Sequence, residues 1–243
     1  MKLNFLFKTV NCISIHHKEK GLVAIGDDEK IIIIDSALQR LGERIFTRLH
    51  SNLISKIAFK PNATGEIASC GFDYVYNTWD FRTGRSRFKV NSSEWLAEQS
   101  RESTDGVSQL TNPPFFHDFA YVKKGKFSIC ALGDGHLILI DNAQGNCIAR
   151  EKGHEGMVTN VESKGVGGNI CISGGVDKNI RIWNVTDTEI NAIGGFAHSA
   201  KINCIKCLKQ QNETSYSTAA DLGKVFVADA MSSGEISVVE AIS

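Results

Sequence analysis

Two segments of the chain carry the same four residue types at the same spacings. His50, Ser69, Asp73 and Trp79 are separated by 19, 4 and 6 residues, and His154, Ser173, Asp177 and Trp183 repeat these intervals. Each quartet spans short apolar runs joined by a turn that contains Gly and Asp, a pattern typical of paired β-strands. The repetition of all four positions indicates duplicated units that form the same supersecondary structure.

Five segments align with one another around such a turn: LVAIGDDEKIIIID, EIASCGFDYVYNTWD, SICALGDGHLILID, ICISGGVDKNIRIWN and FVADAMSSGEISVVE. Their last residues are Asp35, Asp80, Asp141, Asn184 and Glu240, so successive units lie 45, 61, 43 and 56 residues apart. These steps indicate a unit of roughly 40–45 residues that two insertions lengthen.

Each segment follows another strand-like run, namely NCISI, ISKIAF, HDFAYV, VTNVES or INCIKCL. A further strand can be drawn after each segment, as in RIFTRL and CIAREK, which gives four strands per unit. No segment shows a sustained helical period. We therefore expect a single all-β domain over residues 1–243.

The quartets and the Trp-Asp ends resemble the WD40-repeat β-propellers, in which four-stranded blades surround a central channel. The resemblance implies a propeller of which five blades are detectable. Such propellers usually have about seven blades, so two alternatives stay open: a smaller ring, or a seven-bladed ring from which blades are absent. The segment LNFLFKTV, residues 3–10, supplies the outer strand of the last blade in the first case and is an orphan strand in the second.

The same resemblance implies that each His, Ser, Asp and Trp quartet forms a hydrogen-bonded network inside its blade. Physical chemistry supports this role, because Asp suits tight turns, Trp offers one N–H donor, and a buried network is stable when every member is paired. In the first, third and fifth units Ile34, Ile140 and Val239 take the Trp position, so we expect those blades to rely on aliphatic packing.

Two patterns suggest chemistry, and both are better explained by structure. His154, Ser173 and Asp177 have the composition of a hydrolase triad, but Ser173 lies in CISGGV within a strand pair and not on a G-x-S-x-G strand-to-helix turn. Cys204 and Cys207 form C-x-x-C on a strand, where positions i and i+3 point to opposite faces and cannot share a metal ion. We therefore predict no enzyme, no catalytic residue, no metal site and no cofactor.

The charge balance argues against general affinity for nucleic acid or anionic membranes, because 27 Lys and Arg match 27 Asp and Glu. Arg85, Arg87 and Lys89 alternate along RTGRSRFK and offer a local basic surface for RNA or phosphorylated partners. Charged residues on an outer strand more often protect a sheet edge, so nucleic acid is not the favoured partner.

Other features favour a cytoplasmic or nuclear protein. The aliphatic runs are far shorter than the ~20 residues of a membrane span, and Lys8 interrupts the apolar start too early for a signal peptide. Seven scattered cysteines do not resemble a secreted disulfide framework, so we expect free thiols.

Two insertions are polar and are expected to form surface loops. Residues 90–116 are rich in Ser, Glu, Gln and Thr, and residues 209–224 are similarly polar. Trp95 and Leu96 are the apolar exception in the first insertion. They either tuck against a blade or form a small docking motif.

The order of the pieces resembles the WD repeat-containing protein 53 family over most of the chain, with the family's N-terminal blades lacking. The resemblance rests on LHSNLISKIAFKPNATGEIASCGFDYVYNTWD, an insertion that ends QLTNPP, and KGHEGMVTNV. It implies a non-catalytic substrate receptor that docks on the cullin-4 ubiquitin ligase through its propeller adaptor, the damage-specific DNA-binding protein subunit. A generic assembly scaffold is the alternative, because a fold does not fix a function.

Receptors for that adaptor commonly carry a sixteen-residue sequence that ends Trp-Asp-x-Arg, and residues 67–82 fit it. Trp79, Asp80 and Arg82 are therefore the predicted partner-binding residues, with the Arg82 guanidinium fork facing acidic or carbonyl groups of the partner. The fourth unit has Asn184 and Thr186 at the corresponding last positions, so it lacks the intact sequence.

Overall fold

The computed structural model describes residues 9–19, 21–35, 44–47, 49–95, 112–164, 168–207, 224–229 and 236–240. Within them, regular structure is β-strand apart from two 3₁₀ turns, η1 (Ser92–Trp95) and η2 (Lys123–Gly125). No helix in this part of the chain is long and apolar enough to cross a membrane. The backbone contacts divide the chain into two units, Met1–Asn91 and Ser92–Ser243.

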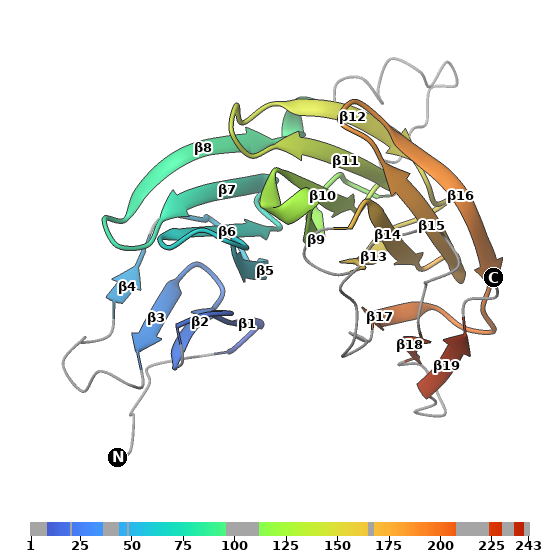
Figure 1. The fold of residues 1–243 in the computed structure, drawn as a ribbon, viewed down its shortest axis with the longest axis horizontal. Helices are drawn as coiled ribbons and strands as arrows, with labels where there is room; N and C mark the ends of the chain where they lie inside the picture. Colours follow the sequence, from blue (N-terminus) through green and yellow to red (C-terminus); the bar gives the residue numbers. More distant parts are fainter. Residues whose placement is uncertain are drawn as a thin grey trace. The chain divides into compact units, whose positions relative to one another are not determined.

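The first unit holds two four-stranded antiparallel sheets (Figure 1). The first sheet contains β1 (Cys12–Ile15), β2 (Leu22–Gly26), β3 (Ile31–Asp35) and β4 (Arg44–Phe46). The second sheet contains β5 (Ile54–Phe59), β6 (Glu66–Gly71), β7 (Val75–Asp80) and β8 (Arg85–Asn91). In each sheet, strands that are adjacent in the chain pair with one another.

The second unit holds three sheets with the same antiparallel order. The third sheet contains β9 (Phe116–Val122), β10 (Phe127–Leu132), β11 (His136–Asp141) and β12 (Cys147–Lys152). The fourth sheet contains β13 (Val158–Ser163), β14 (Ile170–Gly175), β15 (Asn179–Val185) and β16 (Ile190–Ala197). The fifth sheet has three strands within the described ranges, β17 (Ile202–Cys207), β18 (Lys224–Asp229) and β19 (Ile236–Glu240).

The predicted all-β fold of four-stranded, blade-like units is confirmed. Strands β3, β7, β11 and β19 end at the predicted residues, and β15 continues one residue past Asn184 to Val185. The proposed role of residues 3–10 as an outer strand falls almost wholly outside the described residues.

Parts of both insertions are strands. In the first, β8 continues to Asn91 and β9 begins at Phe116, with η1 after β8. Leu96 and the residues up to 111 lie outside the described part of the chain. In the second insertion, Lys224 already belongs to β18, and the residues before it are likewise outside that part.

The sheets of each unit pack face to face through the strand that opens each sheet. In the first unit, Ile54 and Ile57 of β5 are 0% and 1% exposed because they lie against Leu22, Ala24 and Ile31 of the first sheet. Full burial of one such side chain stabilises the fold by about 1.5–3 kcal/mol. The first and second sheets therefore share one hydrophobic core.

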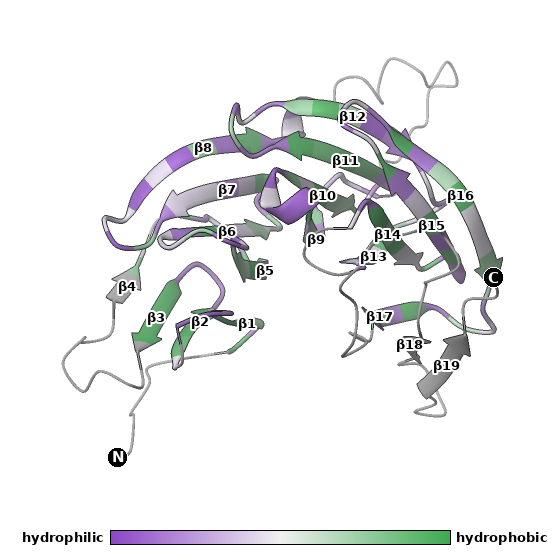
Figure 2. Cartoon of the chain, viewed as in Figure 1, coloured by the Kyte–Doolittle hydropathy of each residue, from purple (hydrophilic) through white to green (hydrophobic). Residues whose placement is uncertain are grey.

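The second unit repeats this packing twice. Val158 and Val161 of β13 join the core of the third sheet, and Ile202 and Ile205 of β17 lie against the fourth sheet. Figure 2 shows β11 as mainly hydrophobic, whereas the outer strand β8 is largely hydrophilic. The central strands therefore carry the core, and the outer strands meet solvent.

A side-chain hydrogen bond reinforces the contact between the fourth and fifth sheets. The Thr159 hydroxyl lies 2.5 Å from the carbonyl oxygen of Ile202 and 3.0 Å from that of Gly174. In the first unit the Cys12 thiol lies 3.7 Å from the carbonyl oxygen of Ile54 and spans the equivalent pair of sheets. In both units a polar side chain on the opening strand thus joins one sheet to the backbone of the next, although Cys12 and Thr159 occupy neighbouring rather than identical register positions.

Replacement of Thr159 by Val should lower the free energy of unfolding by about 1–2 kcal/mol, because it removes the hydroxyl and keeps the branched shape. Thr159→Ser keeps the hydroxyl and is the matched control. Urea denaturation of both variants measures the effect. A Val variant as stable as the Ser variant would show that the hydrogen bond between the sheets is unimportant.

Candidate functional site

An Asp residue closes the turn between the two central strands of the second, third and fourth sheets. Asp73, Asp134 and Asp177 each accept a hydrogen bond from the backbone N–H two residues further on, at 3.1–3.2 Å. The residue between donor and acceptor has a positive φ, as in Tyr74 (65°) and Lys178 (67°). The carboxylate stabilises a conformation that non-glycine residues seldom adopt. This local role explains why Asp recurs at this position.

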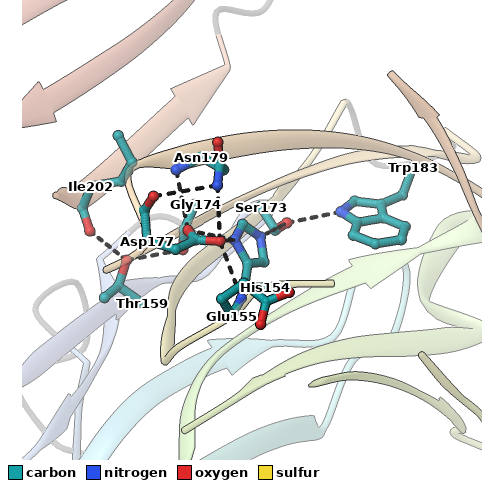
Figure 3. Close-up of polar contacts among 9 residues, drawn as sticks. All are labelled: His154, Glu155, Thr159, Ser173, Gly174, Asp177, Asn179, Trp183 and Ile202. Carbon is teal, nitrogen blue, oxygen red and sulfur yellow. Dashed lines mark hydrogen bonds and ion pairs between the residues drawn. The ribbon is translucent and has the colours of Figure 1, made fainter. Parts of the chain in front are cut away.

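In the fourth sheet this Asp begins a continuous chain of hydrogen bonds (Figure 3). Asp177 lies 2.9 Å from Nδ1 of His154, and Nε2 of His154 lies 2.7 Å from Oγ of Ser173. The indole N–H of Trp183 donates to the same Ser173 oxygen at 2.8 Å. A neutral His154 with its proton on Nδ1 satisfies every member, because it donates to the carboxylate and accepts from the Ser173 hydroxyl. The predicted quartet therefore forms one network.

Burial and pairing set the charges in this network. Burial lowers the pKa of His154, and the hydrogen bond from its ring to Asp177 only partly offsets that effect. Burial alone would raise the pKa of Asp177, but hydrogen bonds from His154 and Asn179 lower it below its usual range. The stable state is thus a neutral imidazole beside an ionised carboxylate.

The contacts among His154, Ser173 and Asp177 match those of a hydrolase triad, but a substrate cannot reach these buried side chains. His154 and Trp183 are each 1% exposed and Ser173 is 0% exposed. A nucleophilic serine must reach a substrate carbonyl, whereas the Ser173 oxygen already lies between His154 and the Trp183 ring. The geometry serves packing, in agreement with the structural role predicted for the quartet.

In the second sheet, only three of the four predicted residues are joined by hydrogen bonds. His50 Nδ1 lies 3.0 Å from Asp73, and His50 Nε2 lies 2.8 Å from the Ser69 hydroxyl. The indole N–H of Trp79 is buried and has no hydrogen-bond acceptor among the described residues. The prediction that Trp79 joins this network is therefore wrong. Trp79 instead packs edge-on against Phe46, with ring centres 4.7 Å apart.

The residue before each histidine explains the difference between the two tryptophans. Gly153 precedes His154, and a Cβ on Gly153 would lie 2.7 Å from Cζ2 of Trp183. Leu49 holds the equivalent position before His50 and packs into the core of the first unit. A side chain there is incompatible with the placement that Trp183 adopts. Trp79 therefore takes another position, from which it does not reach Ser69.

The third sheet contains a polar cluster that was not predicted. Asp134, whose side chain is 2% exposed, lies 3.0 Å from the guanidinium of Arg150 and 3.0 Å from Nδ1 of His136. These partners hold the pKa of Asp134 below its usual range despite the opposite effect of burial. Ile140 is fully buried, but aliphatic packing alone does not describe this sheet. The alignment of Asp134 with Asp73 and Asp177 was the available sequence signal.

The Arg150 guanidinium also lies 5.2 Å from the centre of the Trp95 ring. Trp95 is half-buried at the end of η1. This contact favours the packing alternative for Trp95 over the docking alternative, because the ring lies against β12 of the third sheet.

The turn that follows β7 contains the other predicted site residues. The Asp80 carboxylate accepts hydrogen bonds from the backbone N–H groups of Arg82, at 2.8 Å, and Thr83, at 3.2 Å. Asp141 makes the same pair of bonds after β11, so this Asp has a local structural role. Trp79 is 0% exposed. The prediction that Trp79 contacts a partner directly is therefore wrong.

Arg82 is the accessible member of the predicted partner-binding set. Its side chain is 53% exposed, and one guanidinium nitrogen lies 3.6 Å from the carboxylate of Glu19, which is 46% exposed. Glu19 lies in the loop between β1 and β2 of the first sheet. The structure thus presents a guanidinium and a carboxylate together on the surface of the first unit.

The basic residues of β8 are exposed along the outer strand, as predicted. Arg87 lies 2.6 Å from the carboxylate of Glu66, which Lys60 also approaches at 2.7 Å. This ion pairing neutralises part of the basic surface, which favours edge protection over nucleic-acid binding.

The cysteines are free thiols in the structure. Burial raises the pKa of Cys207 to about 11, so its thiolate is disfavoured. Across the part of the chain that the structure describes, no group of three or more His, Cys, Asp and Glu side chains is placed to hold a metal ion.

The two tryptophans provide a matched test of the network. Trp183→Phe should destabilise the protein by about 1–2 kcal/mol more than Trp79→Phe, because both lose similar ring volume and only Trp183 loses a hydrogen bond. Equilibrium denaturation of both variants gives the difference. Equal losses would contradict the assigned Trp183 to Ser173 bond.

The network should also make stability depend on pH. The folded pKa values of His154 and Asp177 lie below their unfolded values, so the unfolded state binds protons first on acidification. The free energy of unfolding should fall as pH is lowered from about 7, first through His154 and then, below about pH 4, through Asp177. Denaturation curves from pH 7 to 3 measure this slope, which His154→Gln should reduce between pH 7 and 5. A slope that the variant leaves unchanged would contradict the assignment.

Two comparisons with known proteins agree with this geometry. The family model described as "WD domain, G-beta repeat" matches residues 145–184, a stretch that includes the complete network of the fourth sheet. The WD repeat-containing protein 53 homolog of Dictyostelium discoideum is 23% identical over an alignment 253 residues long, gaps included. The alignment covers 93% of this chain and 66% of the relative. The chain therefore spans just under two thirds of that relative's length. The blade-like sheets, the family match on one repeat and the similarity along most of the chain together make the chain similar to WD40-repeat proteins, among them the WD repeat-containing protein 53 homolog.

Proposed function

We propose that this WD-repeat protein is a non-catalytic interaction module that docks on a partner through the turn after β7. The observation that carries the proposal is the half-exposed Arg82 side chain on a turn that Asp80 holds in place. A fixed backbone lowers the entropy cost of presenting the guanidinium to a partner. The fork-shaped group suits carboxylate or carbonyl acceptors.

A non-catalytic role is supported by the burial of the groups with catalytic composition. Ser173 is inaccessible, and Trp183 and His154 occupy its polar contacts. Among the described residues, the candidate metal ligands do not cluster. What remains at the surface is a set of turns that differ in sequence from sheet to sheet, which suits recognition of proteins.

The pairing of Arg82 with Glu19 is compatible with docking. The two groups are 3.6 Å apart and about half exposed, and exposed ion pairs of this kind stabilise a protein by at most about 1 kcal/mol. A partner carboxylate can therefore replace Glu19 at little cost. Glu19 would then be free to meet a basic group of the partner, so that the two residues act together.

The partner that we propose is the propeller adaptor of the cullin-4 ubiquitin ligase, and the chain would act as a substrate receptor in the cytoplasm or nucleus. Support for this finer assignment comes from the sequence at residues 67–82, which ends Trp-Asp-x-Arg. The fourth sheet offers an internal contrast. There Thr186 holds the turn through its hydroxyl, which accepts hydrogen bonds from the N–H groups of Thr188 and Glu189, and no guanidinium is presented at the corresponding position.

Arg82→Ala should weaken binding of the purified adaptor at least tenfold, because the Ala variant lacks the guanidinium group that is proposed to contact the adaptor. Arg85→Ala removes another exposed Arg only three residues away and is the matched control. Isothermal titration calorimetry with both variants and the unmodified protein measures the effect.

Circular dichroism melting of the same samples confirms that each variant is folded. Equal affinity in the Arg82 and Arg85 variants would reject the proposed surface. Absence of any binding by the unmodified protein would reject the adaptor as the partner and favour a generic assembly scaffold.

A further inference from the structure

Glu19, whose carboxylate faces Arg82, is held in place by the loop between β1 and β2. Its backbone N–H donates to Nδ1 of His16 at 2.9 Å, and its carbonyl oxygen accepts from the N–H of Leu22 at 3.3 Å. On the other side of the ion pair, the Arg82 side chain runs beside Gly65, where a Cβ would lie 3.5 Å from Cδ of Arg82. Contacts outside the Arg82 to Glu19 pair therefore help to set its geometry.

His16 closes this loop in the way that Asp80 closes the turn after β7. Nδ1 of His16 accepts from the N–H groups of Lys18, at 3.2 Å, and Glu19, which are two and three residues further on. Asp80 accepts from the residues at the same two offsets, the first of which is Arg82. Two turns with one hydrogen-bond pattern thus present the two charges of the surface. A carboxylate keeps its acceptor oxygens near neutral pH, whereas a histidine can take up a proton there.

The contacts of His16 define its protonation state. The ring is 5% exposed, stacks on the His17 ring at 4.8 Å and meets the Phe59 ring edge-on at 4.9 Å. Nδ1 accepts two hydrogen bonds, so it carries no proton, and the single proton of the neutral ring lies on Nε2. Nε2 has no hydrogen-bond partner among the described residues. The closed loop therefore contains a neutral imidazole.

Protonation of His16 on Nδ1 is incompatible with the closed loop. The new N–H would point at the two backbone N–H groups that Nδ1 now accepts, so both hydrogen bonds would be lost. The imidazolium would also be buried without an acceptor for either of its protons, which is costly. Opening of the loop relieves both costs, and it removes the bond that holds the Glu19 backbone.

Other titratable groups lie around the loop, and they do not hold Glu19. His17 is exposed, and its Nε2 accepts from the N–H of Asn62 at 3.3 Å, so it secures the loop to the second sheet. The charged residues next to the His16 contacts are Lys18 and Glu19 on the loop, and Arg82 and Lys60 on the second sheet, where Lys60 pairs with Glu66 at 2.7 Å.

We propose that His16 is a positioning residue of the docking surface, and that its neutral imidazole fixes Glu19 opposite Arg82. This inference rests on the function proposed above, because it concerns the same surface. The closed loop presents a carboxylate beside a guanidinium, which suits a partner that offers a basic and an acidic group at matching positions. Acidification opens the loop, withdraws Glu19 from the pair and weakens docking.

Amide exchange of the unmodified chain, followed by NMR from about pH 8 to 5, tests the loop without any partner. Protection of the Glu19 amide, relative to the intrinsic exchange rate, should fall about tenfold over this range, which is the effect of one lost hydrogen bond. The Thr188 and Glu189 amides are the internal control, because the Thr186 hydroxyl holds them in the same pattern and does not titrate. Their protection should stay constant.

Two substitutions of His16 separate hydrogen-bond acceptance from proton uptake. His16→Asn keeps a side-chain oxygen that can close such a turn and takes up no proton in this range, so protection of the Glu19 amide should stay high at every pH. His16→Leu removes the acceptor, so protection should be low at every pH. His17→Gln is the matched control and should retain the pH dependence of the unmodified chain. Melting curves verify that each variant is folded.

Calorimetry of adaptor binding at the two ends of the pH range tests the effect on docking. The unmodified chain should bind about two- to fivefold more weakly at the lower pH, which is the contribution of one exposed ion pair. The His16→Asn variant should show no such loss. An equal pH effect in both proteins would come from the adaptor and would overturn the link between His16 and docking.

The exchange data decide the role of His16 whether or not the adaptor binds. Constant protection of the Glu19 amide in the unmodified chain would overturn that role, and so would loss of the pH dependence in His17→Gln. Absence of adaptor binding at the higher pH would reject the proposed function. In that case a fall in protection that His16→Asn abolishes would still show that His16 holds Glu19.

Discussion

The second, third and fourth sheets carry buried apolar side chains on both faces, and the fold depends on covering both faces. Isolated four-stranded sheets cannot do so, because one face would always meet water. The successive sheets solve the problem within each unit, as in the packing of Ile54 and Ile57 on the first sheet and of Ile202 and Ile205 on the fourth. The repeated apolar residues of the opening strands therefore form the same packing surface in successive sheets.

The polar networks follow from the same constraint. A tight turn that needs an Asp brings a carboxylate close to a water-poor interior, where it must be paired. His154 pairs with Asp177 in the fourth sheet. In the third sheet, Arg150 and His136 both pair with Asp134. Contacts that resemble catalytic machinery thus arise from the need to satisfy buried groups. The function proposed above instead uses an exposed turn, that of Arg82, where Asp80 holds the backbone and the side chain is accessible.

The sequence was sufficient to predict much of the fold, because the turn residues and the alternation of apolar residues are local signals. The ends of β7 and β11 follow from Asp80 and Asp141, whose carboxylates accept hydrogen bonds from the turns that come next. The Trp79 placement was not predictable from the spacing of the quartet, since the residue before the histidine, Leu49 here and Gly153 in the fourth sheet, is not one of the four repeated positions. The pairing of Arg150 with Asp134 was also missed, because it requires the register of β12 on β11, which a bulge shifts. The proximity of Arg82 to Glu19 depends on how the first two sheets pack.

Backbone hydrogen exchange in the fourth sheet tests most directly whether covered faces hold this fold together. Strand β14 pairs with both β13 and β15, and β16 pairs with β15 at the sheet edge, so the comparison uses only the amides of each strand that hydrogen-bond to β15; β14 is almost wholly buried whereas most of β16 is exposed. If face packing dominates, amides of β14 will exchange only through global unfolding, and those of β16 will exchange through smaller openings of lower free energy. Equal protection of the two strands would show that strand pairing alone stabilises the sheet, and would contradict the account.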